Sequence, residues 1–219
     1  MTDWPVLSSL SEADREQILR TGRRRQFSRG ETLFHYGDPA DSVHLLAVGR
    51  VAVRVLTPQG DQAILAVLGP GRVFGELALI DPQARRTATI TAMQRCETIA
   101  LHRTQFEQLR TQHPKVDRFL LATLAAQVNR LYEHLLELLF VPAPLRVLHR
   151  LSVLAEEFDD EPIAMTQEEL GLVSGTTRPT VNEVLEDLDR QGVVRIGRGR
   201  IEVLNRGVLE RRLGRVYRR

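Results

Sequence analysis

Short apolar runs separated by turns fill the first half of the chain. Five strand-like runs lie at residues 43–47, 51–56, 63–68, 87–91 and 97–101. Glycine or proline stands in the connections between the first three runs, and β-branched residues dominate the run at residues 87–91. Many short strands at even spacing, bounded by turn residues, are typical of a β-roll or barrel. We therefore predict a β domain over residues 1–113.

A helical period replaces the strand pattern after residue 113. Residues 115–141 contain neither glycine nor proline, and apolar residues recur at alternating intervals of three and four, at Leu121, Leu124, Val128, Leu131, Leu135 and Leu138. This spacing is the heptad seam of a coiled coil. A single amphipathic helix lying against its own domain would show the same spacing over so short a segment. Leu120, Leu136 and Leu139 widen the apolar stripe, which favours a dimerisation helix over residues 114–141.

Proline interrupts the helical pattern at Pro142 and Pro144. Because proline removes a backbone donor and clashes with the preceding turn, these residues end the long helix and mark a hinge. A new helical pattern then covers residues 145–158. We expect residues 142–219 to form a separate domain.

Two short helices around a tight turn follow in this domain. Thr166 and Glu169 have the spacing of a capping box, which begins a helix, and Gly175 ends that helix. Thr177, followed by a proline just inside the next helix, restarts the pattern. This arrangement predicts a helix-turn-helix, although many helical hairpins bind nothing. Residues 195–204 predict a β-hairpin with a basic Gly-Arg-Gly tip, which would form a wing.

Composition and charge narrow the class of protein. A chain of 219 residues with 42% hydrophobic residues suits two domains with ordinary cores. No apolar run approaches the roughly 20 residues that cross a bilayer, and the first residues lack the pattern of a secretory signal. The single cysteine, Cys96, cannot form an internal disulfide, so we expect a cytoplasmic protein. The net charge is only +2, but eleven arginines stand against six acidic residues from Ser174 to the end.

Residues 73–92 carry the most specific chemistry in the chain. A helical turn beginning after Gly75 would leave the backbone N–H groups of Gly75, Glu76 and Leu77 free to bind a phosphate. Arg86 can pair with the same phosphate through its fork of donors, and the Glu76 carboxylate can accept a hydrogen bond from a ribose hydroxyl. Since neighbours on a strand point to opposite faces, only one of Arg85 and Arg86 can enter such a pocket.

This segment resembles the phosphate-binding cassette of cyclic-nucleotide-binding domains. The matching residues are Phe74, Gly75, Glu76, Leu77, Ala78, Leu79, Arg86, Thr87, Ala88 and Thr89. Spacing from Glu76 in the family selects Arg86 rather than Arg85 as the phosphate ligand. Gly75 as a simple turn glycine and Arg86 as a surface charge are the plainer interpretation of the same residues.

The whole chain resembles the CRP/FNR family of bacterial transcription regulators. The resemblance implies an α+β protein with an N-terminal double-stranded β-helix, or jelly roll, a long dimerisation helix and a C-terminal winged helix-turn-helix. It implies a homodimer that binds a near-palindromic site in double-stranded DNA, with half-sites about 34 Å apart, and that contacts RNA polymerase. We do not expect an enzyme, because the sequence contains no nucleophile–base pair and its six histidines have no metal-ligand spacing.

The family's DNA contacts can be carried over to the helix-turn-helix and wing. Arg178 matches the first arginine of the recognition helix and would read guanine in the major groove. The full set of candidate DNA contacts is Thr166, Gln167, Thr176, Thr177, Arg178, Thr180, Asn182, Glu183, Arg198 and Arg200. Where the best-known members carry glutamate after that arginine and a second arginine four residues further on, this chain has Pro179 and Glu183. We therefore expect a half-site that keeps the guanine but departs from the best-known consensus.

The resemblance also places the ligand's base on the long helix. In cAMP-responsive members a Thr-Ser pair there binds adenine, and Leu131 and Tyr132 occupy those positions here. Leu131 cannot form that hydrogen bond, whereas Tyr132 could stack on the base or bond through its hydroxyl. With Thr87, the Arg-Thr-Ala-Thr sequence at residues 86–89 is similar to cassettes that favour cGMP. The candidate ligand-binding residues are Gly75, Glu76, Leu77, Arg86, Thr87, Leu131 and Tyr132, and the expected effectors are cAMP, then none, then cGMP.

Two rival functions remain at this point. One is a regulator of the same architecture that needs no effector and is controlled by its abundance. The other is a cyclic-nucleotide module that controls a protein partner, as in kinase regulatory subunits. In the preferred hypothesis, the ligand binds better to one arrangement of the helical seam, and the hinge at Pro142 and Pro144 passes that preference to the DNA-binding domain.

Overall fold

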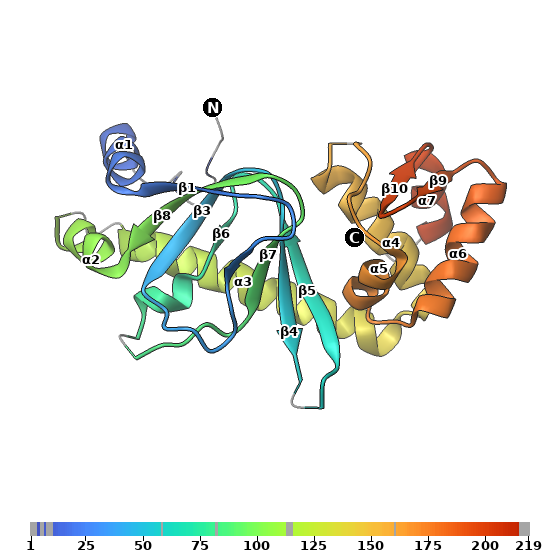
Figure 1. Ribbon diagram of the computed structural model, residues 1–219, viewed down its shortest axis with the longest axis horizontal. Helices are drawn as coiled ribbons and strands as arrows, with labels where there is room; N and C mark the ends of the chain where they lie inside the picture. The colour runs from blue at the N-terminus through green and yellow to red at the C-terminus, as the bar shows by residue number, and fades with distance from the viewer. Residues whose placement is uncertain are drawn as a thin grey trace. The chain divides into compact units, whose positions relative to one another are not determined.

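The computed structural model describes residues 4, 7, 11–57, 59–81, 83–112, 116–159 and 161–214. The chain divides into a first unit, residues 1–55 with 67–131, and a second unit, residues 56–66 with 132–219 (Figure 1). The predicted boundary residues His113 and Pro114, and three of the counted arginines, Arg215, Arg218 and Arg219, lie outside the described residues. None of the described helices is both long and apolar enough to cross a membrane.

Two four-stranded antiparallel sheets build the β domain (Figure 1). In spatial order, one contains β1 (Arg23–Phe27), β8 (Cys96–His102), β3 (Ser42–Val48) and β6 (Val73–Phe74). The other contains β2 (Thr32–Phe34), β7 (Thr89–Ala92), β4 (Val51–Leu56) and β5 (Gln62–Leu68). The predicted β-roll is therefore confirmed, and the bounds of β4 match the predicted run at residues 51–56.

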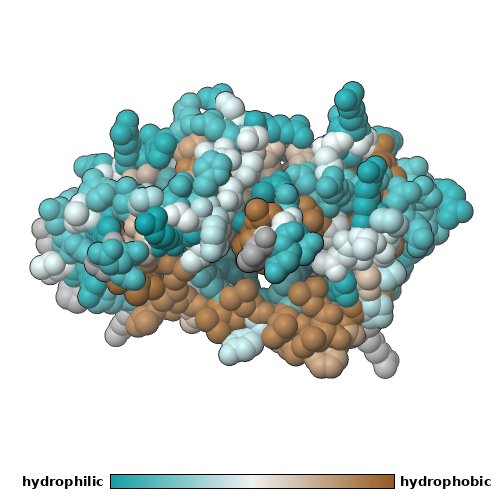
Figure 2. Space-filling model, turned by 60° about the horizontal axis from the view of Figure 1, so that its bottom comes forward, coloured by the Kyte–Doolittle hydropathy of each residue, from teal (hydrophilic) through white to brown (hydrophobic). Residues whose placement is uncertain are grey.

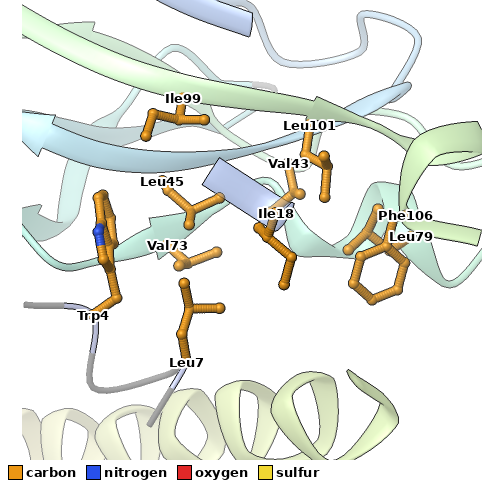
Figure 3. Close-up of a cluster of buried hydrophobic side chains, with 10 residues drawn as sticks. All are labelled: Trp4, Leu7, Ile18, Val43, Leu45, Val73, Leu79, Ile99, Leu101 and Phe106. Carbon is orange, nitrogen blue, oxygen red and sulfur yellow. The ribbon is translucent and has the colours of Figure 1, made fainter. Parts of the chain in front are cut away.

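Two hydrophobic clusters form the core of this domain. One joins residues of both sheets: Phe27, Leu33, Leu46, Val51, Phe74, Ile90, Ala92 and Cys96. The other combines strand residues with residues from outside the sheets (Figure 3): Trp4, Leu7, Ile18, Val43, Leu45, Val73, Leu79, Ile99, Leu101 and Phe106. Successive residues of a strand point to opposite faces, so β3 supplies Leu45 to one cluster and Leu46 to the other.

Three helices were not predicted from the sequence: α1 (Glu12–Thr21), α2 (Arg103–Gln112) and α7 (Arg206–Leu213). Each is short and mostly polar, so its apolar period is weak. Ile18 of α1 and Phe106 of α2 are buried in the cluster of Figure 3, while Leu209 and Leu213 are the buried residues of α7. A few buried side chains hold each helix in place. Each helix has 10 or fewer residues, and so short a segment does not reveal a helical period in its apolar residues.

The long helix α3 (Val116–Phe140) has one face against the hydrophobic cluster of Figure 3 and another in solvent. Leu120 packs against the cluster of Figure 3 and Thr123 is buried. Leu120 therefore packs against the domain's own core and does not widen the exposed stripe, whereas Leu136 and Leu139 are exposed.

The helix α4 (Ala143–Glu157) begins immediately after Pro142. The sequence predicted a start at residue 145, but Pro144 lies inside the first turn of the helix. Proline is tolerated there because the first N–H groups of a helix have no intrahelical partner.

Two short helices and a hairpin complete the second unit. They are α5 (Gln167–Ser174), α6 (Arg178–Arg190), β9 (Val194–Gly197) and β10 (Arg200–Val203). Thr166 and Glu169 form the predicted capping box, and Gly175 ends α5 in the left-handed conformation, with φ of 59°. The two helices bury Leu170, Val173, Val181, Leu185 and Leu188, whereas Val184 is only half-buried.

Candidate functional site

The cassette begins with a tight turn at Gly75. Gly75 adopts the left-handed conformation, with φ of 77°, and caps the 3-10 turn η2 (Glu76–Leu79). Glycine is required for this backbone because a side chain would be strained at positive φ. The strand β6 enters the turn at Phe74, and the Glu76 side chain is buried while that of Leu77 is exposed. The predicted helical turn is thus present at the predicted residues.

Arg86 turns into the domain and Arg85 turns out. The Arg86 side chain is only 5% exposed, and it donates hydrogen bonds from Nη1 to the Ser42 carbonyl at 2.7 Å and from Nη2 to Ser42 Oγ at 3.0 Å. Its guanidinium carbon lies 4.0 Å from the centre of the Phe34 ring. Asp41 supplies a carboxylate oxygen 3.6 Å from Arg86 Nη2. Arg85 is exposed and donates to the Gly37 carbonyl.

The surroundings of Arg86 fit an anionic ligand. The Arg86 Nε atom is buried and, within the described part of the chain, has no hydrogen-bond partner. A Cβ at Gly75 would lie 2.6 Å from Arg86 Nη1, so a larger residue would occupy the space between the turn and the arginine. Burial lowers the pKa of Arg86 from its usual value, and the charges of Asp41, Asp38 and Glu76 oppose that shift. An anion would add a favourable charge and an acceptor for the unpaired donor.

His44 lies buried beside this arginine. Its ring stacks on Phe74, with centroids 5.3 Å apart, and its Nδ1 lies 3.1 Å from Thr98 Oγ1. Its Nε2 lies 3.5 Å from the hydroxyl of Ser42, which also binds Arg86. Burial, followed by the charge of Arg86, lowers the pKa of His44 from 6.5 to about 3. His44 is therefore neutral at physiological pH.

The depressed pKa of His44 predicts acid sensitivity. Because the pKa is lower in the folded than in the unfolded state, only the unfolded state gains a proton as the pH falls below 6.5. We expect the free energy of unfolding of the β domain to fall by about 1.5 kcal/mol between pH 6.5 and 5 through this residue. Urea unfolding of the wild type and the His44→Gln variant at both pH values measures the difference.

A matched variant controls for the other histidines. His102 is exposed on β8, so His102→Gln should keep the wild-type dependence on pH. If His44→Gln and the wild type lose the same free energy of unfolding over this range, then His44 is not held neutral by its surroundings.

The other candidate ligand residues lie on the surface. Thr87 is exposed in the bend that follows Arg86. On α3, Leu131 is 59% exposed and Tyr132 is 63% exposed. Leu131 belongs to the first unit and Tyr132 to the second. The contact of these three residues with a nucleotide base stays a prediction.

A groove in the second unit joins the start of α5, the start of α6 and the hairpin. Its volume is about 390 Å³. Four of the candidate DNA contacts line it together: Thr166, Gln167, Arg178 and Arg200. Arg178 is exposed at the first residue of α6, where the helix dipole also favours a phosphate. Two arginines, Arg178 and Arg200, and one acidic residue, Glu168, line the groove, so its side chains carry a net positive charge.

The remaining candidate DNA contacts do not line this groove. The Thr177 and Thr180 hydroxyls lie 3.2 Å apart at the start of α6, and Thr176 occupies the turn before it. Asn182 donates a hydrogen bond to Glu186 one turn further along α6. Arg198 is exposed in the tight turn of the hairpin, and Glu183 is exposed on α6.

Sequence reasoning missed the residues that surround Arg86. Phe34, Asp41, Ser42 and His44 all precede the cassette by more than 25 positions along the chain. No local pattern of residue types linked these four residues to Arg86. No group of three or more His, Cys, Asp or Glu among the described residues could hold a metal ion.

Two family models match different parts of the chain. A model described as a cyclic nucleotide-binding domain matches residues 24–113. A model described as a Crp-like helix-turn-helix domain matches residues 129–212. The first match contains the cassette and Arg86, and the second contains the groove and the hairpin.

Several characterised proteins are similar over most of the chain. The cyclic AMP receptor protein of Thermus thermophilus is 32% identical over 206 residues, which is 94% of this chain and 95% of that protein. The CRP-like cAMP-activated global transcriptional regulator of Mycobacterium tuberculosis is 30% identical over 177 residues, 78% of this chain and 79% of that protein.

Solved structures show the same fold. The catabolite activator protein of Thermus thermophilus matches with a TM-score of 0.57 at 32% identity, covering 95% of this chain and 98% of that one. The c-di-GMP responsive global regulator CLP of Xanthomonas campestris matches with a TM-score of 0.74 at 20% identity, covering 88% of this chain and 99% of that one. The second likeness concerns the fold alone.

Proposed function

The chain belongs to the CRP/FNR family of transcription regulators, and we propose that it is a homodimer whose binding to DNA is stimulated by a cyclic nucleotide, with cAMP the first candidate. It is a DNA-binding transcription regulator with a cyclic nucleotide-binding domain. Its relatives are regulators and not enzymes. Beyond the family, we propose the effector, the dimer, the DNA contacts and the contact with RNA polymerase.

The surroundings of Arg86 are the main support for a cyclic-nucleotide ligand. It is a buried cation with an unpartnered Nε donor in the described structure, next to a glycine turn whose backbone N–H groups begin a helical turn. A cyclic nucleotide has a single negative charge on its phosphate, which one guanidinium fork and a few N–H groups can neutralise. In this proposal Gly75, Glu76 and Leu77 supply the N–H groups, and the Glu76 carboxylate accepts from the ribose hydroxyl.

The base of the nucleotide is the less determined half of the proposal. The two relatives described above are named for cyclic AMP, which favours cAMP. Leu131 cannot bond to adenine, while Tyr132 offers a ring and a hydroxyl on the same helix. Thr87 keeps cGMP as a candidate, ranked after cAMP and after the absence of any effector. The relative at 20% identity that responds to c-di-GMP shows that this fold also serves other effectors.

An exposed apolar face on α3 supports the homodimer. Figure 2 shows apolar side chains, in brown, gathered along the lower part of one face of the molecule. Among the side chains of α3 that the structure describes, nine large hydrophobic residues are exposed: Leu121, Val128, Leu131, Tyr132, Leu135, Leu136, Leu138, Leu139 and Phe140. A heptad seam of this kind is buried by a second copy in a two-fold coiled coil, and two-fold dimers are the commonest oligomers. Such a dimer presents two helix-turn-helix modules to a near-palindromic site.

Titration calorimetry with cAMP and with cGMP, followed by DNA binding, tests the proposal. We expect one cyclic nucleotide to bind per protomer and to raise the affinity for a selected DNA site by a factor of about 5 to 150, the usual range of allosteric coupling. DNA binding that is strong and unchanged by either nucleotide would favour the effector-independent regulator. Nucleotide binding without any salt-dependent DNA binding would favour a module that controls a protein partner.

A further inference from the structure

Three aromatic rings stand together beside the guanidinium of Arg86. The centre of the Phe34 ring lies 4.0 Å from the guanidinium carbon, and the centres of the Phe34 and His44 rings lie 5.8 Å apart. His44 on β3 pairs with Phe74 on β6, and their rings stack with an angle of 11° between the planes. This packing requires an aromatic ring at position 44 but not its nitrogen atoms, since phenylalanine would stack in the same way. The two ring nitrogens of His44 therefore serve contacts outside the stack.

The nitrogens of His44 lie in a buried chain of hydroxyl groups. Nδ1 lies 3.1 Å from Thr98 Oγ1, and Nε2 lies 3.5 Å from Ser42 Oγ. His44 and Thr98 are almost completely buried, and burial, followed by the charge of Arg86, lowers the pKa of His44 to about 3. The ring therefore carries a single proton at neutral pH. The Ser42 hydroxyl donates its own proton to Asp41 Oδ1 at 2.9 Å, so toward His44 it can only accept.

These partners assign the proton of His44 to Nε2. The Nε2–H group donates to Ser42 Oγ, and Nδ1 accepts from the Thr98 hydroxyl, so each donor in the chain meets an acceptor. The hydrogen bonds run in one direction, from Thr98 through His44 and Ser42 to Asp41, and the members of such a chain strengthen one another. His44 thereby fixes the rotation of the Ser42 hydroxyl.

Ser42 in turn holds both terminal nitrogens of Arg86. Its carbonyl accepts from Nη1 at 2.7 Å, and its hydroxyl accepts from Nη2 at 3.0 Å. Two hydrogen bonds from one residue fix the plane of the guanidinium as well as its position. Arg86 Nε remains a buried donor that has no partner in the described part of the chain. A group that is already held in place loses less conformational freedom when it binds a ligand.

We propose that His44 is a positioning residue of the nucleotide site, which holds the Ser42 hydroxyl as an acceptor and thereby fixes the guanidinium plane of Arg86 before a ligand binds. Because its ring is buried, His44 acts through Ser42 and does not itself contact the nucleotide. The effect on nucleotide affinity rests on the proposed function, while the claim about Arg86 concerns the β domain alone.

Titration calorimetry with cAMP on two variants of the full-length protein separates the role of the nitrogen from that of the ring. His44→Phe keeps the stack on Phe74 but has no donor, and it should bind cAMP about tenfold more weakly, as when a partner that orients a metal ligand is removed. His44→Gln loses the ring, but its amide nitrogen lies as many bonds from the backbone as Nε2 of histidine. It should bind cAMP within about threefold of the wild type, because it can still donate to Ser42.

The order of these two variants distinguishes positioning from packing. His44→Phe retains an apolar ring in a buried place, so its melting temperature should be at least that of His44→Gln, although its affinity for cAMP is lower. A purely structural role would give both properties the same order. His35→Phe, the same substitution at an exposed histidine of the β domain, should leave the cAMP affinity unchanged. In a Ser42→Ala background, His44→Phe should weaken cAMP binding by no more than about twofold further, since the path through the hydroxyl is already lost.

Nuclear magnetic resonance of the free protein tests the claim about Arg86 without any nucleotide. Nitrogen chemical shifts of the His44 ring should identify Nε2 as the protonated atom. Rotation of the Arg86 guanidinium about its Nε–Cζ bond breaks both hydrogen bonds to Ser42. This rotation should be at least about tenfold faster in His44→Phe than in the wild type, because the Ser42 hydroxyl is no longer held as an acceptor. His35→Phe should keep the wild-type rate.

The inference is overturned by wild-type cAMP affinity in His44→Phe, by affinity in His44→Gln as low as in His44→Phe, by unchanged rotation of the guanidinium in His44→Phe, or by a proton on Nδ1. A loss of affinity that persists in full in the Ser42→Ala background also overturns it, because His44 would then act by another path. If the wild type binds neither cAMP nor cGMP, the proposed function is contradicted. The protonated nitrogen of His44 and the rotation of Arg86 then decide the positioning role by themselves.

Discussion

Replacing Arg86 with leucine is expected to abolish nucleotide-stimulated DNA binding and to weaken cyclic-nucleotide binding at least about a hundredfold. Truncating one partner of a buried, hydrogen-bonded charge pair costs about 2 to 5 kcal/mol, and every 1.4 kcal/mol is about tenfold in affinity. Arg86 is the buried cation at the cassette, and leucine has neither its charge nor its donors. Titration calorimetry with cAMP and DNA-binding titrations with and without cAMP measure both effects.

Arg85→Leu is the matched control for this prediction. Arg85 is the neighbouring residue, of the same type, but it is exposed and bonds to the Gly37 carbonyl. The Arg85→Leu variant should bind cyclic nucleotide with nearly wild-type affinity. Because Arg86 also donates to Ser42, the melting temperature of Arg86→Leu must be measured, and Arg86→Lys tests the fork without removing the charge. If cAMP stimulates DNA binding by Arg86→Leu as strongly as by the wild type, then the nucleotide binds at another site.

Replacing Leu135 with glutamate is expected to convert the proposed dimer to a monomer and to weaken specific DNA binding about a hundredfold or more. Leu135 lies in the heptad seam of α3 and is 52% exposed in the single chain. In a two-fold interface each protomer carries the change. Two carboxylates would then be buried close to each other, and neither would have a partner of opposite charge. Linking two binding modules raises the overall affinity by about 10² to 10⁴, and this gain is lost in a monomer. Sedimentation analysis and DNA-binding titrations measure the two effects.

Asn129→Glu provides the control on the same helix. Asn129 is exposed on α3 and is not one of the six heptad-seam residues, so the same new charge should leave assembly and DNA affinity unchanged. The seam assignment is wrong if Leu135→Glu sediments like the wild type, or if Asn129→Glu disrupts assembly equally.

Features that depend on neighbours within a few residues could be predicted from the sequence. The capping box of Thr166 and Glu169, the end of α5 at Gly175 and the bounds of β4 all depend on contacts within a few residues or on the alternation of one strand. The residue pattern of the cassette and the position of its helical turn belong to the same class. The helices α1, α2 and α7 escaped prediction because a few distant core contacts, rather than a strong local period, hold them.

The sequence by itself determined which chemistry the chain carries: a guanidinium and a glycine turn in the β domain, a heptad stripe, and a helix-turn-helix with a basic hairpin. Only the tertiary structure decided which of these groups meet. Arg86 bonds to Ser42, which is 44 positions away, and His44 meets Thr98, 54 positions away. The same packing put Leu120 in the core and Leu138 against Gly175. Contacts of this range depend on how sheets and helices close on one another, and a local pattern of residue types contains no information about that closure.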